Sequence, residues 1–91
     1  MHPHVYTVLS AAQRRRLLED LRDNCPQSID PRFEDETPTP AEIRFETVRM
    51  HHVHLPMLAD YGFIEWTPGD EKVTRGPEFD RIEEVLQAAT A

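Results

Sequence analysis

A helical pattern that runs directly into a strand pattern, over residues 48–67, constrains the fold of this chain more than any other feature. Residues three, four and seven apart share one face of a helix, and four apolar residues follow this spacing: Val48, Leu55, Leu58 and Ala59. Gly62 is suited to end the helix, and the apolar-polar alternation from Phe63 to Thr67 is typical of a strand. The sequence therefore predicts a long helix that leads at once into a β-hairpin.

The bounds of the long helix follow from its proline and capping residues. It is expected over residues 41–61, with Thr39 as its cap and Pro40 at the first helical position. Pro56 lies inside this range, where a proline removes one backbone hydrogen bond and presses its ring against the carbonyl of His52. A kink near His52 is therefore expected.

A first helix is predicted upstream of this region. Ser10 and Gln13 have the spacing of a capping box at its start, and Asn24 with Pro26 ends it. Its buried stripe is expected to contain Leu17, Leu18 and Leu21. Its polar face is expected to carry Arg14, Arg15 and Arg16.

The hairpin and a last helix complete the predicted elements. Residues 63–67 and 72–74 are expected to pair over Pro68-Gly69-Asp70. An amphipathic helix follows Gly76-Pro77, and one of its faces carries Phe79, Ile82, Leu86 and Ala89.

With 91 residues the chain has room for one domain, 1–91, with a modest core. Residues 1–7 are expected to form a loose arm. Residues 25–40 are rich in proline and acid, so a loop is expected there in place of a regular helix. No run of about twenty apolar residues is present and the N-terminus lacks signal-peptide features, so we expect a cytoplasmic protein without a membrane segment.

The charge balance indicates adaptation to a salty interior. Acidic residues number 17 against 10 basic ones, the net charge is −7, and Lys72 is the only lysine. Carboxylates keep a protein hydrated in concentrated salt, and we interpret this composition as halophilic. At about 1 M salt the Debye length falls to about 3 Å, so the net charge says little about nucleic-acid binding.

The phrase HHVHLPMLADYG, from His51 to Gly62, resembles a phrase of small haloarchaeal winged-helix domains. The same segment resembles the recognition helix of the ArsR-like helix-turn-helix superfamily, through Leu55, Leu58, Gly62, Phe63 and Ile64. The resemblance covers roughly residues 8–90. It implies an archaeal α+β, mostly α, winged-helix domain: helix, short turn, long recognition-type helix, hairpin wing and C-terminal helix. The proline- and acid-rich loop stands where that fold has its second helix.

Three functions from different classes are consistent with these residues. The first is a homodimeric regulator of transcription that binds double-stranded DNA and dimerises through its terminal helices. Its expected DNA contacts are Arg49, His52, Val53, Lys72 and Arg75. The second is a protein-interaction module on a degenerate winged-helix frame, which would use a surface of Met50, Val53 and Met57.

The third function is a metal- or redox-responsive regulator. His51 and His54 are spaced as a helical metal-ligand pair, and Cys25 or a carboxylate would have to complete the site. Cys25 is also the only candidate for a redox switch. Glycine-rich phosphate loops and nucleophile elbows are missing from the sequence, so we expect no enzyme and no cofactor.

Overall fold

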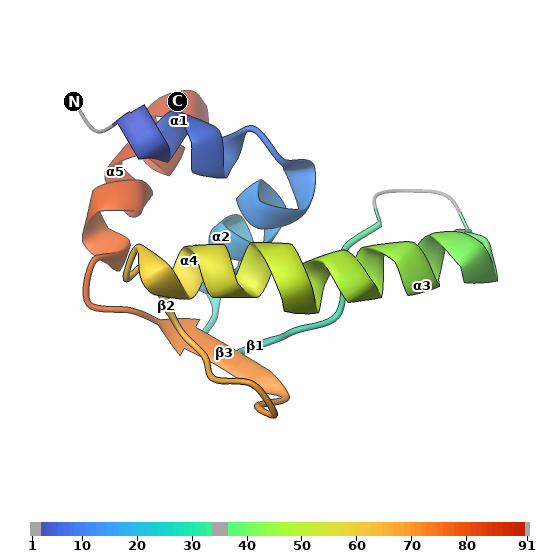
Figure 1. Cartoon of the computed structure of the whole chain (residues 1–91). Coiled ribbons are helices and arrows are strands. Elements are labelled where there is room, and N and C mark those ends of the chain that lie inside the picture. The colour runs from blue at the N-terminus through green and yellow to red at the C-terminus, as the bar shows by residue number, and fades with distance from the viewer. Residues whose placement is uncertain (1–2, 34–36, 91) are drawn as a thin grey trace.

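A computed structural model describes residues 3–33 and 37–90 (Figure 1). The chain is an α+β protein, mostly helical, with a small three-stranded antiparallel sheet. Its elements in order are α1 (Pro3–Leu9), α2 (Ala12–Asp23), β1 (Gln27–Ser28), α3 (Pro40–Arg49), the π-helical turn η1 (Met50–His54), α4 (Leu55–Asp60), β2 (Ile64–Glu65), β3 (Lys72–Arg75) and α5 (Phe79–Thr90). This confirms the predicted class.

The predicted hairpin forms the larger part of the sheet. Strands β2 and β3 pair antiparallel, with Ile64 opposite Arg75, and β1 adds to the other side of β3. The Asp70 carboxylate accepts from the amide and the hydroxyl of Thr67 at 3.0 and 2.9 Å, which holds the turn between the strands. These bonds lower the pKa of Asp70, because they stabilise its charged form. Strand β1 was not predicted, since two residues are too short for a detectable alternation.

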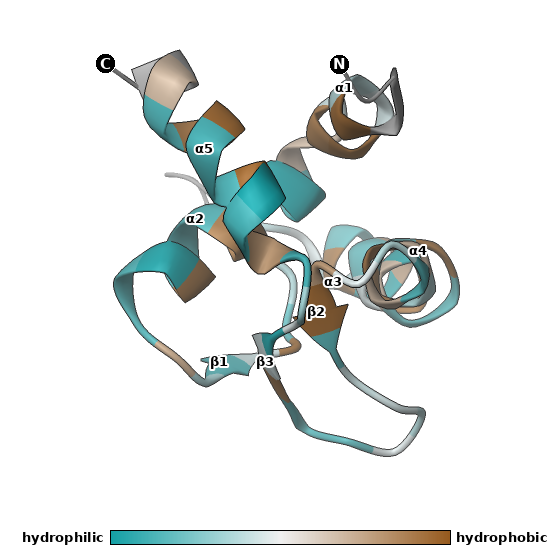
Figure 2. Cartoon of the chain, turned by 90° about the vertical axis from the view of Figure 1, so that its left-hand side faces the viewer, coloured by the Kyte–Doolittle hydropathy of each residue, from teal (hydrophilic) through white to brown (hydrophobic). Residues whose placement is uncertain are grey.

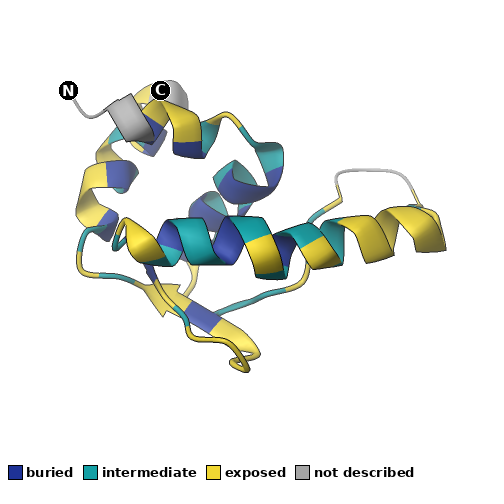
Figure 3. Ribbon diagram, in the orientation of Figure 1, coloured by how far each residue is buried: buried dark blue, intermediate teal, exposed yellow. Residues whose placement is uncertain are grey.

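The core lies where α2, α4, α5 and the sheet meet (Figure 3). The predicted stripe of α2 is confirmed, because Leu17, Leu18 and Leu21 are fully buried. The predicted face of α5 is confirmed for Phe79, Ile82 and Leu86, which are all buried. The side chain of the fourth predicted residue, Ala89, lies outside the described part. Figure 2 shows the same alternation of hydrophobic and hydrophilic ribbon along α5. In the described residues no helix combines the length and the apolar character that a membrane crossing requires.

Helix α1 replaces the loose arm that was expected over residues 1–7, of which residues 1 and 2 lie outside the described part. Val5 and Val8 are buried in the core, so packing against the rest of the protein stabilises this helix. The carbonyls at the end of α1 accept from two arginines of α2: Arg14 binds Thr7 and Val8, and Arg15 binds Leu9.

The capping box predicted at Ser10 was wrong. The residue that precedes α2 is Ala11, which offers no side-chain cap, and the Ser10 hydroxyl donates to the Thr7 carbonyl instead. The side-chain amide of Gln13 donates to the Arg32 carbonyl at 2.6 Å and accepts from the Arg32 backbone amide at 2.7 Å. Gln13 therefore binds a distant loop rather than the start of its own helix.

The long helix is confirmed in its extent, as three consecutive segments. Thr39 caps it through a complete capping box, in which the Thr39 hydroxyl accepts from the Glu42 amide and the Glu42 carboxylate accepts from the Thr39 amide. Around His52, where a kink was expected, the backbone forms the π turn η1, in which the Leu55 amide donates to the Met50 carbonyl, five residues back. A wider turn leaves room for the ring of Pro56.

This π turn changes which residues face the core. Leu55 and Leu58 are fully buried as predicted, but Val48 is 57% exposed, so its assignment to the core face was wrong. Met50, expected on the outer face, is fully buried instead. An α-helical wheel fails here because the π turn inserts one extra residue between Met50 and Leu55.

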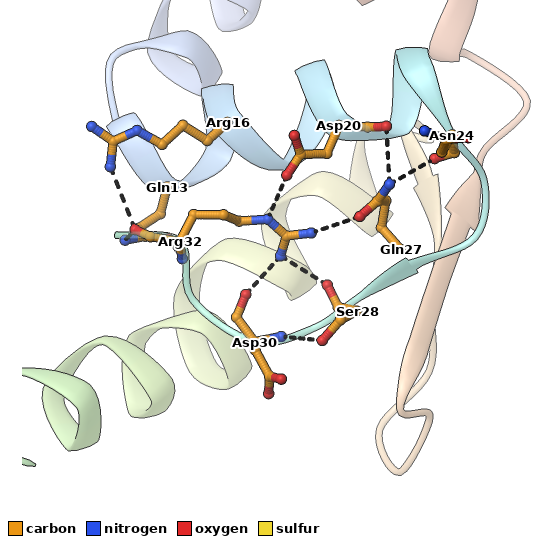
Figure 4. A network of polar contacts seen from close by, with 8 residues as sticks. All are labelled: Gln13, Arg16, Asp20, Asn24, Gln27, Ser28, Asp30 and Arg32. Carbon is orange, nitrogen blue, oxygen red and sulfur yellow. Dashed lines mark hydrogen bonds and ion pairs between the residues drawn. The ribbon is translucent and has the colours of Figure 1, made fainter. Parts of the chain in front are cut away.

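The loop between α2 and α3 contains no helix in its described parts, 24–33 and 37–39. The acidic residues 34–36 fall outside the described residues. Arg32 fixes the first part of the loop (Figure 4): its guanidinium donates to the Asp20 carboxylate at 2.9 Å and to the Ser28 and Asp30 carbonyls at 2.8 and 2.6 Å. Gln27 of β1 joins this network: its side-chain oxygen accepts from Arg32 at 3.3 Å, and its side-chain amide donates to the Asp20 and Asn24 carbonyls at the end of α2.

Candidate functional site

Helix α3 projects away from the body of the protein (Figures 1 and 3). None of its ten residues is buried. Its three large apolar residues are therefore exposed to solvent, Ile43 to 43%, Phe45 to 63% and Val48 to 57%. Figure 2, which looks nearly along the long helix, shows hydrophobic and hydrophilic residues on several of its sides. We call these ten residues, 40–49, the projecting helix.

The charges on the projecting helix are balanced. It carries Glu42, Arg44, Glu46 and Arg49, two of each sign, in a chain whose net charge is −7. The Arg49 Nε lies 3.9 Å from the Glu46 carboxylate, and its guanidinium lies 5.7 Å from the centre of the Phe45 ring. Arg49 keeps 43% of its side chain exposed. A long ion pair of this exposure adds little stability and leaves the guanidinium available to a partner.

The residues predicted to contact DNA lie on two elements. Arg49, His52 and Val53 follow one another along the long helix, where His52 is exposed and Val53 is half-buried. Lys72 is exposed at the start of β3. Arg75, at the other end of β3, donates to the Leu21 and Arg22 carbonyls at 2.7 and 3.0 Å, and its guanidinium lies over the Phe79 ring.

The contacts of Arg75 give it a structural role within the chain, and its contact with DNA stays a prediction. Its guanidinium caps the C-terminal end of α2, where exposed carbonyls attract a positive charge. The arginines expected on the polar face of α2 are occupied in the same way, since Arg14 is buried and Arg15 and Arg16 donate to the Leu9 and Arg32 carbonyls. Arg14, Arg15, Arg16 and Arg75 thus connect α1, α2, the loop after α2 and β3 through backbone carbonyls.

The three histidines of the long helix have different surroundings. His54 is buried, with its Nδ1 atom 2.9 Å from Nη1 of Arg14, and burial together with the charges of Arg14 and Arg49 lowers its pKa to about 4. His51 binds the Thr47 carbonyl through Nδ1 at 2.9 Å. His52 is exposed. Among the described residues, no group of three histidine, cysteine or carboxylate side chains could hold a metal ion.

The two histidines of the expected metal pair make separate contacts. The Nδ1 atom of His54 is committed to Arg14, in the core, whereas the ring of His51 points to the hairpin and meets Trp66 edge-on, with 6.4 Å between ring centroids. Cys25, the other candidate, is an exposed free thiol in the loop after α2. The described structure brings no third metal ligand to either histidine.

A cleft separates the long helix from the hairpin, and the sequence did not indicate it. Its volume is about 640 Å³, and it is lined by His51, His52, Pro56, Ala59, Asp60, Trp66, Pro68 and Gly69. Trp66 is held in the wall because its indole N–H donates to the Asp70 carbonyl at 3.1 Å. A tryptophan close to the hairpin turn was the only available signal, since the wall depends on how the hairpin folds back.

The terminal helices, where dimerisation was expected, bury their apolar stripes within the monomer. Leu17, Leu18 and Leu21 of α2, which is the first helix that was predicted, and Phe79, Ile82 and Leu86 of α5 all belong to the core. Tyr6, 61% exposed, is the large apolar side chain that the described part of α1 presents to solvent. The surplus apolar surface is on the projecting helix instead.

Comparisons of the chain with known protein families, with curated proteins and with solved structures find no match. The functional proposals below therefore depend on the geometry of the described residues.

Proposed function

We propose that this chain is a protein-interaction module, built on a helix-and-hairpin frame of winged-helix type, that binds its partner through the projecting helix. The observation that carries the proposal is the exposure of Ile43, Phe45 and Val48 on a helix with no buried residue. Exposed apolar residues scattered singly over a surface need no explanation, but Phe45 and Val48 are neighbours on one face of this helix and Ile43 is exposed on another, and apolar surface gathered on one element in this way marks interaction sites.

The stability of the projecting helix supports the same function. Isolated helices shorter than about 12–15 residues are marginal in water, because most helical stability comes from packing one face against other elements. Among the described residues this helix is held by its capping box, by its continuation into η1 and by a 3.4 Å hydrogen bond from the Gln13 side chain to the Glu46 carboxylate, and none of its own residues is buried. A partner that covers its apolar residues would supply the missing packing.

The distribution of basic residues favours a protein over a nucleic acid as the partner. DNA binding depends on arginine and lysine side chains that reach phosphates. Seven of the nine arginines contact carbonyls or carboxylates of the same chain: Arg14, Arg15, Arg16, Arg22, Arg32, Arg75 and Arg81. Arg49, whose contact with Glu46 is 3.9 Å long, stays available. Around the hairpin turn, Lys72 is next to Asp70 and Glu71.

A DNA-binding transcription regulator of winged-helix type is the second candidate. It is favoured by the hairpin lying beside the long helix, through the contact between His51 and Trp66, as a wing lies beside a recognition helix. Arg44 and Lys72 are both exposed, and within the described residues neither forms an ion pair with an acid. Together with Arg49, these cations would give weak binding that decreases as salt is added.

Two measurements on the same preparations distinguish these functions. In the first, wild-type protein and a Phe45→Glu variant are used as bait, and the captured proteins are identified by mass spectrometry; Tyr6→Glu, an equally exposed aromatic on α1, serves as the matched control. We expect a defined partner, a second copy included, that is retained by the control and lost from Phe45→Glu. Equal capture by all three proteins would contradict the proposal.

In the second measurement, fluorescence anisotropy follows the titration of genomic DNA fragments with each protein at several salt concentrations. The interaction module should show no preference for any fragment over random DNA. Preferential binding of one fragment that survives in the Phe45→Glu variant would establish the regulator instead.

A further inference from the structure

The geometry points to a second copy of this chain as the partner of the projecting helix, with the two helices antiparallel about a two-fold axis. This inference rests on the proposed function, because it names the occupant of the same surface. A two-fold contact is self-complementary: the same patch is used on both subunits, and every contact occurs twice. The projecting helix has the residue pattern that such a contact requires.

The apolar part of the pattern is a stripe of exposed residues along one side of the helix, where Ala41 and Phe45 also line an open cleft of about 560 Å³ whose other wall contains Phe33. Ala41, Phe45 and Val48 are spaced four and three residues apart, so they share one face, and all three are exposed. When two copies of this helix lie antiparallel, a two-fold axis between Phe45 and Val48 sets Phe45 against the partner's Val48, and the reverse. Two large apolar pairs then leave water together.

The charged part of the pattern flanks this stripe. In the same arrangement Glu42 lies beside the partner's Arg49, and symmetry forms that pair twice. Residues on either side of an apolar seam form interhelical ion pairs that set partner choice and orientation in coiled coils. The exposed guanidinium of Arg49 is available, since its contact with Glu46 is 3.9 Å long.

The balance of charge favours a second copy over other partners. Two chains of net charge −7 repel each other, so they associate best through a surface that is itself neutral. The projecting helix is neutral, with two glutamates and two arginines. A partner of uniform sign, such as DNA or a basic peptide, would be repelled by two of these four side chains.

Charge reversal tests the arrangement. Glu42→Arg would place two arginines together at each end of the seam, and Arg49→Glu would place two glutamates together, so each variant alone should dimerise roughly tenfold or more weakly than wild type. An equimolar mixture of the two variants should associate again, because one chain then carries arginine at both positions and its partner carries glutamate at both. The double variant Glu42→Arg/Arg49→Glu should also dimerise, since each pair keeps opposite charges.

Recovery in these experiments has no explanation within one chain. Residues 42 and 49 are seven apart, which is about 10.5 Å along a helix, so their side chains do not pair in the same helix. Glu42→Arg also removes the capping box with Thr39, but the double variant lacks that box in both chains and the mixture lacks it in one. Recovered association therefore reports the contact between chains and not helix stability.

The measurement is sedimentation equilibrium over a wide range of protein concentration, at a potassium chloride concentration where circular dichroism shows all variants folded. We expect wild type, the mixture and the double variant to form dimers. Each single variant should associate more weakly. A monomeric wild type, or a dimer that neither charge reversal nor Phe45→Glu weakens, would overturn the inference. Capture of a different protein that Phe45→Glu abolishes, with a monomeric wild type, would overturn it while leaving the proposed function intact.

Discussion

Arg14 and His54 meet inside the protein, with the guanidinium Nη1 2.9 Å from the imidazole Nδ1 and only 6% and 2% of the two residues exposed. A guanidinium only donates hydrogen bonds, so Nδ1 of His54 accepts and the imidazole is neutral. Other atoms of the same guanidinium donate to the Thr7 and Val8 carbonyls. Arg14 of α2 thus connects the end of α1 to the π turn of the long helix.

This contact predicts how stability depends on pH. Burial, and then the charges of Arg14 and Arg49, lower the pKa of His54 from 6.5 to about 4. Between these two values the unfolded chain binds a proton at this histidine and the folded chain does not. The contribution of His54 to stability is therefore complete above about pH 6.5, and is lost as the pH falls toward 4, by about 1.4 kcal/mol per pH unit.

Urea unfolding at pH 7, 6 and 5 measures this slope. His54→Asn keeps an acceptor for Arg14 but does not titrate, so it should be less stable at pH 7 and lose less stability on acidification than wild type. His52→Asn, which changes an exposed histidine in the same turn, should keep the wild-type slope. Equal slopes for wild type and His54→Asn would show that His54 is not the group responsible.

Removal of the guanidinium gives a second prediction. Arg14→Ala should lower the free energy of unfolding by about 2 kcal/mol or more, because the Thr7 and Val8 carbonyls and the His54 ring lose their donor inside the protein. The same variant should raise the pKa of His54, since one of the positive charges that lower it is gone. Chemical denaturation gives the first quantity, and an NMR titration of the ring gives the second.

Arg15→Ala is the matched control for this variant. Arg15 is the next residue, is only half-buried, and donates to one carbonyl at the end of α1. We expect a loss below about 1 kcal/mol and no change in the His54 titration. A loss as large as that of Arg14→Ala would assign the stability to helix propensity rather than to the buried contact.

Local signals in the sequence predicted the elements that depend on near neighbours. Thr39 and Glu42 lie three residues apart and form the expected capping box, and the hairpin formed where alternation and turn residues placed it. Ser10 carries an equally good signal, but its hydroxyl is used by the Thr7 carbonyl. The helix that supplies this carbonyl was not predicted, so the competition for Ser10 could not be seen.

Contacts between distant residues and one irregular turn account for the other errors. The run of arginines at 14–16 has the pattern of a solvated face, and only the carbonyls at the end of α1 explain why Arg14 is buried. The wheel of the long helix failed at Val48 and Met50 because one π turn displaces every residue before it relative to those after it. The candidate site changed for the same reason: the outer face contains Phe45 and Val48 rather than Met50.

Gly76, between β3 and α5, gives a prediction about close packing of backbone. A Cβ atom added there would press on the Gly62 carbonyl oxygen and lie 2.8 Å from the backbone nitrogen and oxygen of Ile64, none of which can move alone. Gly76→Ala should therefore destabilise the protein by about 3 kcal/mol, measured by urea unfolding.

Gly69, in the hairpin turn, is the control for this substitution. Its φ of +102° is unfavourable for alanine, but no atom lies within 4 Å of an added Cβ. Gly69→Ala should therefore cost only about 1–2 kcal/mol, the strain of a positive φ. A smaller loss for Gly76→Ala than for Gly69→Ala would mean that the junction between β3 and α5 opens without cost.

The last prediction tests the register of the long helix, through two apolar residues that the sequence assigned to the same face. Leu58 is fully buried, so Leu58→Ala should destabilise by roughly 2–5 kcal/mol. Val48 is 57% exposed, so Val48→Ala should change stability by no more than about 0.5 kcal/mol in the monomer. Urea unfolding at a low protein concentration measures both. A loss under about 1 kcal/mol for Leu58→Ala, or equal losses for both variants, would contradict the assignment of Leu58 and Val48 to different faces of the long helix. If the loss for Val48→Ala grows with protein concentration while that for Leu58→Ala does not, the projecting helix is covered by a second copy, because only a contact between chains depends on concentration.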